Sequence, residues 1–351
     1  MSVMADNCER FDFKLPTSQE ASEPPEARGI ARDGVRMLVA HKSTGSLVSS
    51  IFSELPEFLE PGDLVVINTS GTIAAAIEAD APDGTSLVVH LSNELDAGRW
   101  VIELRRKVSD TTERWSGPVP WRRLQLRGGA SIDLDERFGA GDRLWIATLH
   151  VGEPVLCWLE THGRPIRYGY VPRPWPIQTY QNVYATEYGS AEMPSAGRPI
   201  TTDVITRLVA KGIGVAPVLL HTGVASLEDD ELPCPERVRV SSATAQQVNA
   251  THRAGHHVIA VGTTVVRAIE SGATLDGEDS AFDGWTDLVI SPDRGLRVVD
   301  GLVTGWHEPV SSHLMMLEAM IGRDLLEDSY NAALSLGYQW HEFGDSHLIL
   351  P

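Results

Sequence analysis

The sequence predicts an α/β protein whose main domain is interrupted by a small β domain. Short strand-like runs separated by Gly, Asp and Pro extend from about residue 73 to 168, which is typical of a small sandwich or barrel. After this region, apolar strand-like runs alternate with helical patterns, as in an α/β layer. We therefore predict an α/β domain formed by residues 1–72 and 169–351, with the β domain at residues 73–168 inserted into it.

The composition is that of an ordinary globular chain. Of the 351 residues, 42% are apolar and 22% are charged, and the length favours two domains. No apolar run approaches the roughly 20 residues of a membrane helix, and the first residues lack the pattern of a secretory signal. The cysteines Cys8, Cys157 and Cys234 match neither a disulfide framework nor a zinc motif. We expect a cytoplasmic protein that binds no metal.

The strands follow from short apolar runs. Two such runs near the start of the chain cover residues 35–41 and 61–70. The runs of the β domain are residues 86–92, 99–108, 124–134, 143–150 and 154–160. The segment 163–180 is rich in proline and aromatic residues and suits an ordered linker.

Helices and strands alternate after this linker. Residues 201–212 predict a helix that begins at a threonine cap and ends at Gly212. Ser311 and Ser312 are candidate N-caps of the last helix of this region. After the helix at 201–212 we predict, in order, a strand at 213–222, a helix at 241–255, a strand at 256–264, a helix at 265–273, a strand at 296–304 and a helix at 312–322.

Polar residues stand directly after several of these strands. They include Asn68, His221, Thr263 and His307. Ligands of open α/β sheets bind beyond the carboxyl ends of the strands, so we expect these joints to lie near a ligand. A single histidine is more often a packed, hydrogen-bonded residue than a catalyst. A purely structural role therefore stays open for His221 and for His307.

The stretch "VIAVGTTVVRAIES", residues 258–271, predicts an anion site. Apolar residues lead into Gly262, and Thr263 and Thr264 open a helix that carries Arg267. Free backbone amides and the helix dipole attract an anion at such a start, and hydroxyl and guanidinium groups add donors. Alternatively, a threonine only caps the helix and Arg267 forms a surface ion pair. The Lys-Ser/Thr ending of a P-loop is absent, and no G-x-G-x-x-G motif follows a strand. The sequence therefore indicates neither a P-loop nor a Rossmann dinucleotide site.

The charge is acidic overall but uneven. A formal charge of −19 argues against a protein dominated by contacts to a phosphate backbone. Residues 99–127 are the exception, with eight basic and three acidic side chains. This basic stretch is either a solvated face of the β domain or a docking patch for a polyanion.

Six blocks of the chain occur together in one known family. They are "FDFKLP", "YQNVYATEYGSAEMPSAG", "VLLHTG", "VIAVGTTVVRAIES", "VDGLVTGWHEP" and "FGDSHLIL", in the family's order and over nearly the whole chain. They resemble the S-adenosylmethionine:tRNA ribosyltransferase-isomerases of queuosine biosynthesis. The resemblance implies a discontinuous α/β domain with an inserted small β-barrel domain, in agreement with the organisation above.

The resemblance implies an enzyme that uses S-adenosylmethionine as a co-substrate and needs no metal. In this family the ribosyl moiety moves to a 7-aminomethyl-7-deazaguanine base of tRNA, and adenine and methionine are released. Such chemistry needs a base, a clamp for the methionine carboxylate and a slot for adenine. His307 could act as the base or as a proton shuttle, Arg267 could hold the carboxylate, and Trp306 could stack on adenine.

The matching blocks define the candidate site residues. The candidate catalytic residues are His307, His221, Glu236 and Asp345. The candidate residues for binding S-adenosylmethionine are Gly262, Thr263, Thr264, Arg267, Thr304, Trp306, Ser195, Ala196 and Gly197.

The chain departs from the family's pattern at several positions, and the family pattern places Ser70, Pro199 and Gly305 of these around the acceptor. Ser70 stands where the family has an arginine, Ser195 a threonine, Pro199 a histidine and Gly305 an asparagine. Together with the acidic charge, these departures favour a diverged enzyme that acts on a small acceptor, whereas the basic stretch 99–127 favours tRNA. A protein that binds S-adenosylmethionine or RNA without turnover is a further alternative.

Overall fold

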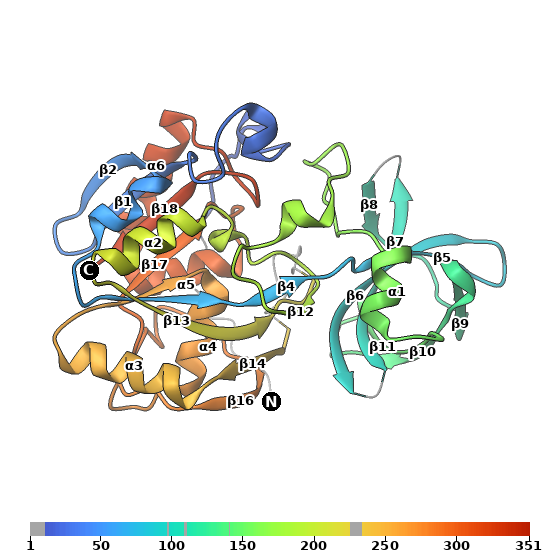
Figure 1. The fold of residues 1–351 in the computed structure, drawn as a ribbon. Coiled ribbons are helices and arrows are strands. Elements are labelled where there is room, and N and C mark those ends of the chain that lie inside the picture. Colours follow the sequence, from blue (N-terminus) through green and yellow to red (C-terminus); the bar gives the residue numbers. More distant parts are fainter. Residues whose placement is uncertain (1–10, 97, 109–110, 140, 225–233) are drawn as a thin grey trace.

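The computed structural model describes residues 11–351 except 97, 109–110, 140 and 225–233. Figure 1 shows an α/β domain on the left and a β-barrel on the right. The barrel strands lie between Ala76 and His150, and the strands of the large sheet come from both sides of this segment. This arrangement confirms the predicted fold class.

The barrel is a closed ring of six antiparallel strands, in the order β5-β6-β7-β11-β10-β9 and back to β5, and β8 pairs with the second half of β7, beyond the part that pairs with β11. Its strands are β5 (Ala76–Asp80), β6 (Ser86–Asp96), β7 (Arg99–Val108), β8 (Thr111–Arg114), β9 (Arg123–Leu126), β10 (Ser131–Arg137) and β11 (Leu144–His150). Alternate side chains fill the interior, as Leu124 and Leu126 of β9 do.

Residues 154–160, predicted as a strand, are helical, and that prediction is wrong. They belong to α1 (Val155–His162), which packs Trp158 and Leu159 against the core of the barrel. Apolar residues occupy all of the first five positions of α1, and such a short run fits a strand and a helix equally well.

The large sheet of the α/β domain has nine strands in the order β16-β14-β13-β3-β15-β17-β18-β1-β2. They are β1 (Arg36–His41), β2 (Ser46–Ile51), β3 (Leu64–Asn68), β13 (Gly214–His221), β14 (Glu236–Val240), β15 (Val258–Val261), β16 (Phe282–Thr286), β17 (Gly301–Gly305) and β18 (Ser346–Leu350). The four central strands β13, β3, β15 and β17 are parallel, so their carboxyl ends meet at one edge. A separate pair, β4 (Ser70–Thr72) and β12 (Glu187–Ser190), lies where the α/β domain meets the barrel (Figure 1).

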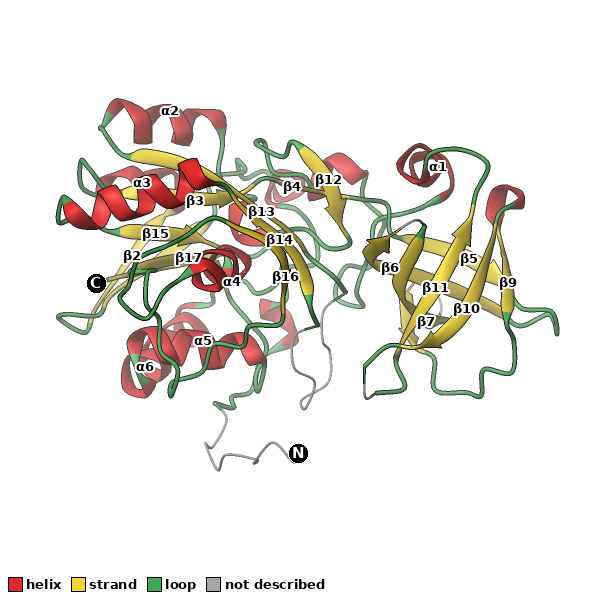
Figure 2. Ribbon diagram, turned by 90° about the horizontal axis from the view of Figure 1, so that it is seen from below, coloured by secondary structure: helices red, strands yellow, loops and turns green. Residues whose placement is uncertain are grey.

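Helices cover both faces of the large sheet (Figure 2). One face packs against α3 (Ser242–Arg253), α4 (Thr263–Gly272), α5 (Ser312–Ile321) and α6 (Arg323–Leu336). The other face packs against α2 (Thr202–Ala210) and the short helix Phe52–Phe58. None of the helices in the described part of the chain has the length and apolar character needed to span a membrane.

Most predicted elements of the α/β domain are present, and the predicted strand 296–304 is shorter than expected. It begins at Gly301, because a buried carboxylate binds the backbone just before it. Glu270 Oε1 accepts hydrogen bonds from the amides of residues 297, 298 and 299 at 2.9, 2.9 and 3.2 Å. These amides are therefore unavailable to a neighbouring strand. The strands β14 and β16 were missed by the sequence analysis.

Candidate active site

A cavity of about 250 Å³ lies at the carboxyl ends of the parallel strands β13, β15 and β17. The loop before α2, the start of α4 and the start of α5 complete its wall. The lining residues are Glu192, Met193, Pro194, Ser195, Ala196, Thr222, Gly223, Val224, Cys234, Glu236, Gly262, Thr263, Thr264, Arg267, Leu288, Val289, Ile290, Thr304, Gly305, His307, Ser312, His313 and Met316.

Nine of the thirteen predicted site residues line this cavity. They are Ser195, Ala196, Glu236, Gly262, Thr263, Thr264, Arg267, Thr304 and His307. They come from four separate segments of the chain, which the parallel sheet brings to one edge. The expected position of a ligand, beyond the carboxyl ends of the strands, thus coincides with a real cavity.

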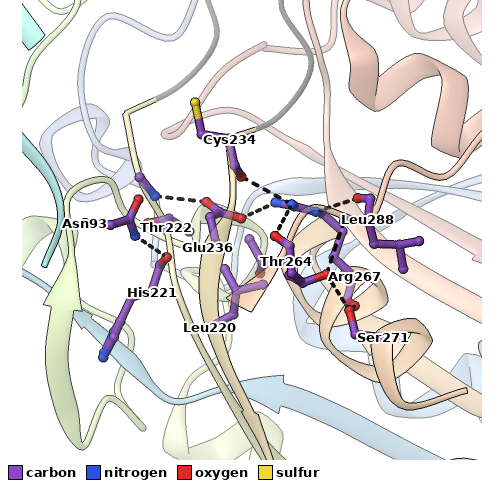
Figure 3. Close-up of polar contacts among 12 residues, drawn as sticks. Asn93, Leu220, His221, Thr222, Cys234, Glu236, Thr264, Arg267, Ser271 and Leu288 are labelled. Atoms are coloured by element: carbon purple, nitrogen blue, oxygen red, sulfur yellow. Dashed lines mark hydrogen bonds and ion pairs between the residues drawn. The ribbon is translucent and has the colours of Figure 1, made fainter. Parts of the chain in front are cut away.

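Arg267 and Glu236 form a nearly buried ion pair in the cavity wall (Figure 3). The guanidinium also donates to the carbonyl of Leu288 at 3.0 Å and to that of Thr286 at 3.2 Å. Glu236 in turn accepts from the amide of Gly223 at 2.9 Å. Burial raises the pKa of Glu236, and Arg267 opposes that rise. Arg267 therefore forms an ion pair, as in the alternative interpretation, but the pair is nearly buried in the cavity wall and does not lie on the surface, and protein acceptors already engage much of the guanidinium.

The starts of α4 and α5 leave backbone amides free beside the cavity. Gly262 precedes α4 with φ of 95°, a conformation that favours glycine, and no side chain caps that helix. Ser311 precedes α5, and its hydroxyl forms no cap either. Thr263 is 9% exposed, and its hydroxyl has no hydrogen-bond partner in the described part of the chain. Two helix dipoles and their amides thus favour an anion at this end of the cavity.

Two histidines face the cavity, and only His307 was expected there from the sequence. The rings of His307 and His313 are parallel, with centroids 4.5 Å apart and an interplanar angle of 2°. Burial lowers the pKa of both, that of His313 to about 4, so both rings are neutral at neutral pH. The sequence contained one signal for His313. This residue directly follows the predicted cap residues, in the first turn of a helix, and a side chain at such a position faces the end of the preceding strand.

Trp306 and Gly197 are packed outside the cavity, although the sequence placed them in the site. The Trp306 side chain is buried, and its ring stacks on His347 at 4.7 Å between centroids. Trp306 therefore presents no free face on which adenine could stack. Gly197 is enclosed by its neighbours, because a Cβ there would lie 1.8 Å from the hydroxyl oxygen of Tyr184.

His221 and Asp345 also lie outside the main cavity. His221 Nδ1 is 2.7 Å from the hydroxyl of Ser70, which is itself 2.6 Å from that of Ser190. Asp345 accepts backbone hydrogen bonds from Arg36 and Gln339, each at 2.8 Å, beside a second cavity of about 10 Å³. Both predicted catalytic residues thus have structural partners. The described residues contain no group of three or more His, Cys, Asp or Glu side chains that could hold a metal ion.

The barrel contributes to the rim of the cavity. Asn93 of β6 donates to the carbonyl of His221 at 3.0 Å (Figure 3). Ser92 accepts from the amide of Val224 at 3.0 Å, and Tyr168 donates to the carboxylate of Glu192. Val224 and Glu192 both line the cavity. The inserted domain therefore holds one side of the site in place.

The basic stretch 99–127 is largely neutralised by acidic neighbours. Seven of its eight basic side chains form ion pairs, and four of the acidic partners lie outside the stretch. Those partners are Glu78, Asp96, Asp133 and Asp142. This pattern favours the interpretation of a solvated, ion-paired face over that of an open docking patch. Asp110 of this stretch lies outside the described residues.

Comparison with known proteins gives consistent matches over almost the whole chain. The family model described as queuosine biosynthesis protein matches residues 8–349. S-adenosylmethionine:tRNA ribosyltransferase-isomerases of Moorella thermoacetica and Thermotoga petrophila are 35% and 32% identical to it. These alignments cover 97% of this chain and 99% and 98% of theirs.

A solved structure shares the fold. The crystal structure of S-adenosylmethionine tRNA ribosyltransferase from Thermotoga maritima matches with a TM-score of 0.55 and 29% sequence identity, covering 97% of this chain and 99% of that one. Sequence and architecture therefore agree over the same extent. The chain belongs to the queuosine biosynthesis protein family.

Proposed function

We propose that this protein is an S-adenosylmethionine:tRNA ribosyltransferase-isomerase. The observation that carries the proposal is that nine residues predicted from the family's motifs line one cavity at the carboxyl edge of the sheet. The full-length relatives support the same activity, because they bear this name. The small-molecule acceptor and the non-catalytic binding protein, both open from the sequence, find no support among these relatives.

S-adenosylmethionine would bind with its carboxylate at the starts of α4 and α5. The free amides at the start of each helix and the hydroxyl of Thr263 are donors suited to a carboxylate. Arg267 adds positive charge close by, but its hydrogen bonds to Glu236 and to backbone carbonyls favour a supporting role. The neutral state of His307 and His313 avoids repelling the sulfonium cation.

The acceptor base would enter from the side of the barrel. Ser92 and Asn93 of the barrel hold the loop after β13, which lines the cavity. Ser195 and Gly305, two of the positions that depart from the family pattern, also line it. Gly305 leaves room where the family has an asparagine side chain, and the acceptor-binding part of the site is therefore altered in this chain.

The test is turnover with defined acceptors. The purified protein is incubated with S-adenosylmethionine and with tRNA carrying 7-aminomethyl-7-deazaguanine, unmodified tRNA or the free base. Adenine and methionine are measured by mass spectrometry, together with the mass of the tRNA nucleoside. We expect both products, and a heavier nucleoside, only with the modified tRNA.

Two results would contradict the proposal. Products formed with the free base but not with the tRNA would indicate a small-molecule acceptor. Tight binding of S-adenosylmethionine in calorimetry without products from any acceptor would indicate a binding protein.

A further inference from the structure

The start of α5 brings a histidine to the cavity that faces the same space as His307. His313 is the second residue of α5, and its ring lies parallel to that of His307 at 4.5 Å between centroids. Both residues line the cavity together with Thr304 and Arg267. Two imidazole edges are therefore presented side by side to any ligand that occupies it.

The two rings differ in what already holds them. His307 Nε2 is 2.9 Å from the hydroxyl of Thr304, so one of its ring nitrogens has a partner. Its backbone is also fixed, because its amide donates to the hydroxyl of Tyr330 at 3.3 Å and its carbonyl accepts from Trp340 at 2.9 Å. Among the described residues, the ring nitrogens of His313 have no hydrogen-bond partner, and both are available to a ligand.

We propose that His313 is the base that takes a proton from the bound substrate, and that His307 is a positioning residue that holds the His313 ring by stacking. This assignment rests on the proposed function. It differs from the sequence-based expectation, in which His307 is the base.

The proton transfer balances within the proposed reaction. The C–H bond next to the sulfonium breaks, its electron pair stays on carbon, and the proton forms an N–H bond on the His313 ring. When the bond from the ribose to adenine breaks, its electron pair leaves with adenine, a lone pair of the ribose ring oxygen is donated to the carbon left behind, and the same proton passes to an adenine nitrogen. No other acid or oxidant is needed for this transfer.

The surroundings of His313 suit a short-lived proton carrier. Burial, and next the charge of Arg267, lower its pKa to about 4, so the ring is neutral and able to accept a proton at neutral pH. A low pKa makes the His313 ring a weaker base for the proton on carbon. The neighbouring sulfonium offsets this, because it acidifies the C–H bond. The same low pKa favours rapid release of the proton to adenine.

The experiment compares His313→Gln with His307→Gln in the adenine-release assay with modified tRNA. We expect His313→Gln to lower kcat by roughly 10²–10⁴-fold, the range for loss of a general base, with the KM for S-adenosylmethionine within about threefold. His307→Gln should lower kcat by about tenfold, because the His313 ring remains present but is less well held. His252→Gln, which removes a histidine of α3 that does not line the cavity, should leave kcat unchanged.

Chemical rescue separates catalysis from packing. In His313→Ala, added imidazoles should restore turnover, and the restored rate should rise with the pKa of the added compound rather than with its size. Circular dichroism and S-adenosylmethionine binding show whether each variant is folded. The proposal is overturned if His313→Gln is folded and retains kcat within about threefold, or if rescue follows only the size of the added compound. An inactive wild-type protein would instead contradict the proposed function.

Discussion

At the scale of single residues, the ion pair between Arg267 and Glu236 changes the role that the sequence predicted for each of them. The sequence assigned one to carboxylate binding and the other to catalysis, whereas the structure joins them in one ion pair with both side chains nearly buried. Removing either partner leaves the other charge without compensation in a buried place, which is costly.

We therefore expect Arg267→Met to destabilise the protein by about 3–5 kcal/mol, the range for breaking a buried pair. Combining it with Glu236→Gln should cost less than the sum of the two single changes, because the unpaired carboxylate is then also removed. Urea unfolding of the wild type, both single variants and the double variant measures this coupling. Additive effects would show that the pair contributes nothing specific.

His252 provides a pH-dependent contribution away from the cavity. Its Nε2 lies 2.9 Å from a carboxylate oxygen of Asp300, and this hydrogen bond raises the pKa of His252. A raised pKa means stabilisation that is fully present below the unfolded-state value and is lost as the pH rises through the folded-state value.

His252→Gln should therefore destabilise the protein more at pH 5.5 than at pH 8.5. The difference should be about 0.5–1 kcal/mol, because the pair is partly exposed. Thermal unfolding at the two pH values tests the sign. An equal loss at both would mean that protonation of His252 plays no part.

At the scale of helices, two serines at N-cap positions differ in what their hydroxyls do. Ser241 accepts a hydrogen bond from the amide of Thr244 at 3.1 Å at the start of α3. Ser311 precedes α5, but its hydroxyl is buried and has no partner among the described residues. The sequence named Ser311 as a candidate cap, yet of these two serines only Ser241, which was placed inside a predicted helix, performs that role.

The same substitution should therefore have different effects at the two helices. Ser241→Ala should cost about 1 kcal/mol, as expected for loss of an N-cap. Ser311→Ala should be neutral within about 0.5 kcal/mol or slightly stabilising, since it removes an unsatisfied buried hydroxyl. Urea midpoints of the two variants give the comparison, and equal losses would contradict the assignment.

At the scale of the whole molecule, ion pairing decides how much positive charge is available to RNA. The net charge is −19, and seven of the eight basic side chains in residues 99–127 are paired with carboxylates. Arg122 is exposed, and no partner is found for it in the described part of the chain. Long-range attraction of tRNA should therefore be weak.

We expect the logarithm of the tRNA affinity to fall by about 2–3 units for each unit of the logarithm of the salt concentration. Each phosphate contact adds somewhat less than one to this slope. Arg122→Glu should weaken binding more than Arg99→Glu, because Asp96 already neutralises Arg99. Fluorescence anisotropy at several salt concentrations measures both effects. A slope of about 6 or more would mean that the ion pairs open to bind phosphates.

The local sequence determined the central strands and helices of the α/β domain and the residues that stand at the carboxyl ends of these strands. Apolar period and turn residues are local properties, so they identified the helices α2 to α5 and the strands β13, β15 and β17, and placed Thr263 and His307 at a ligand edge. Where the local signal was short, as in α1, it failed.

Only the tertiary structure decided which of these side chains face the cavity. The partner of Arg267 lies 31 residues earlier in the chain, and Trp306 turns away because the core residues His347, Tyr330 and Trp340 surround its ring. The stack of His313 on His307 likewise depends on how α5 leaves the end of β17. Side-chain direction and pairing follow from packing between segments that are distant in sequence, and no local pattern contains that information.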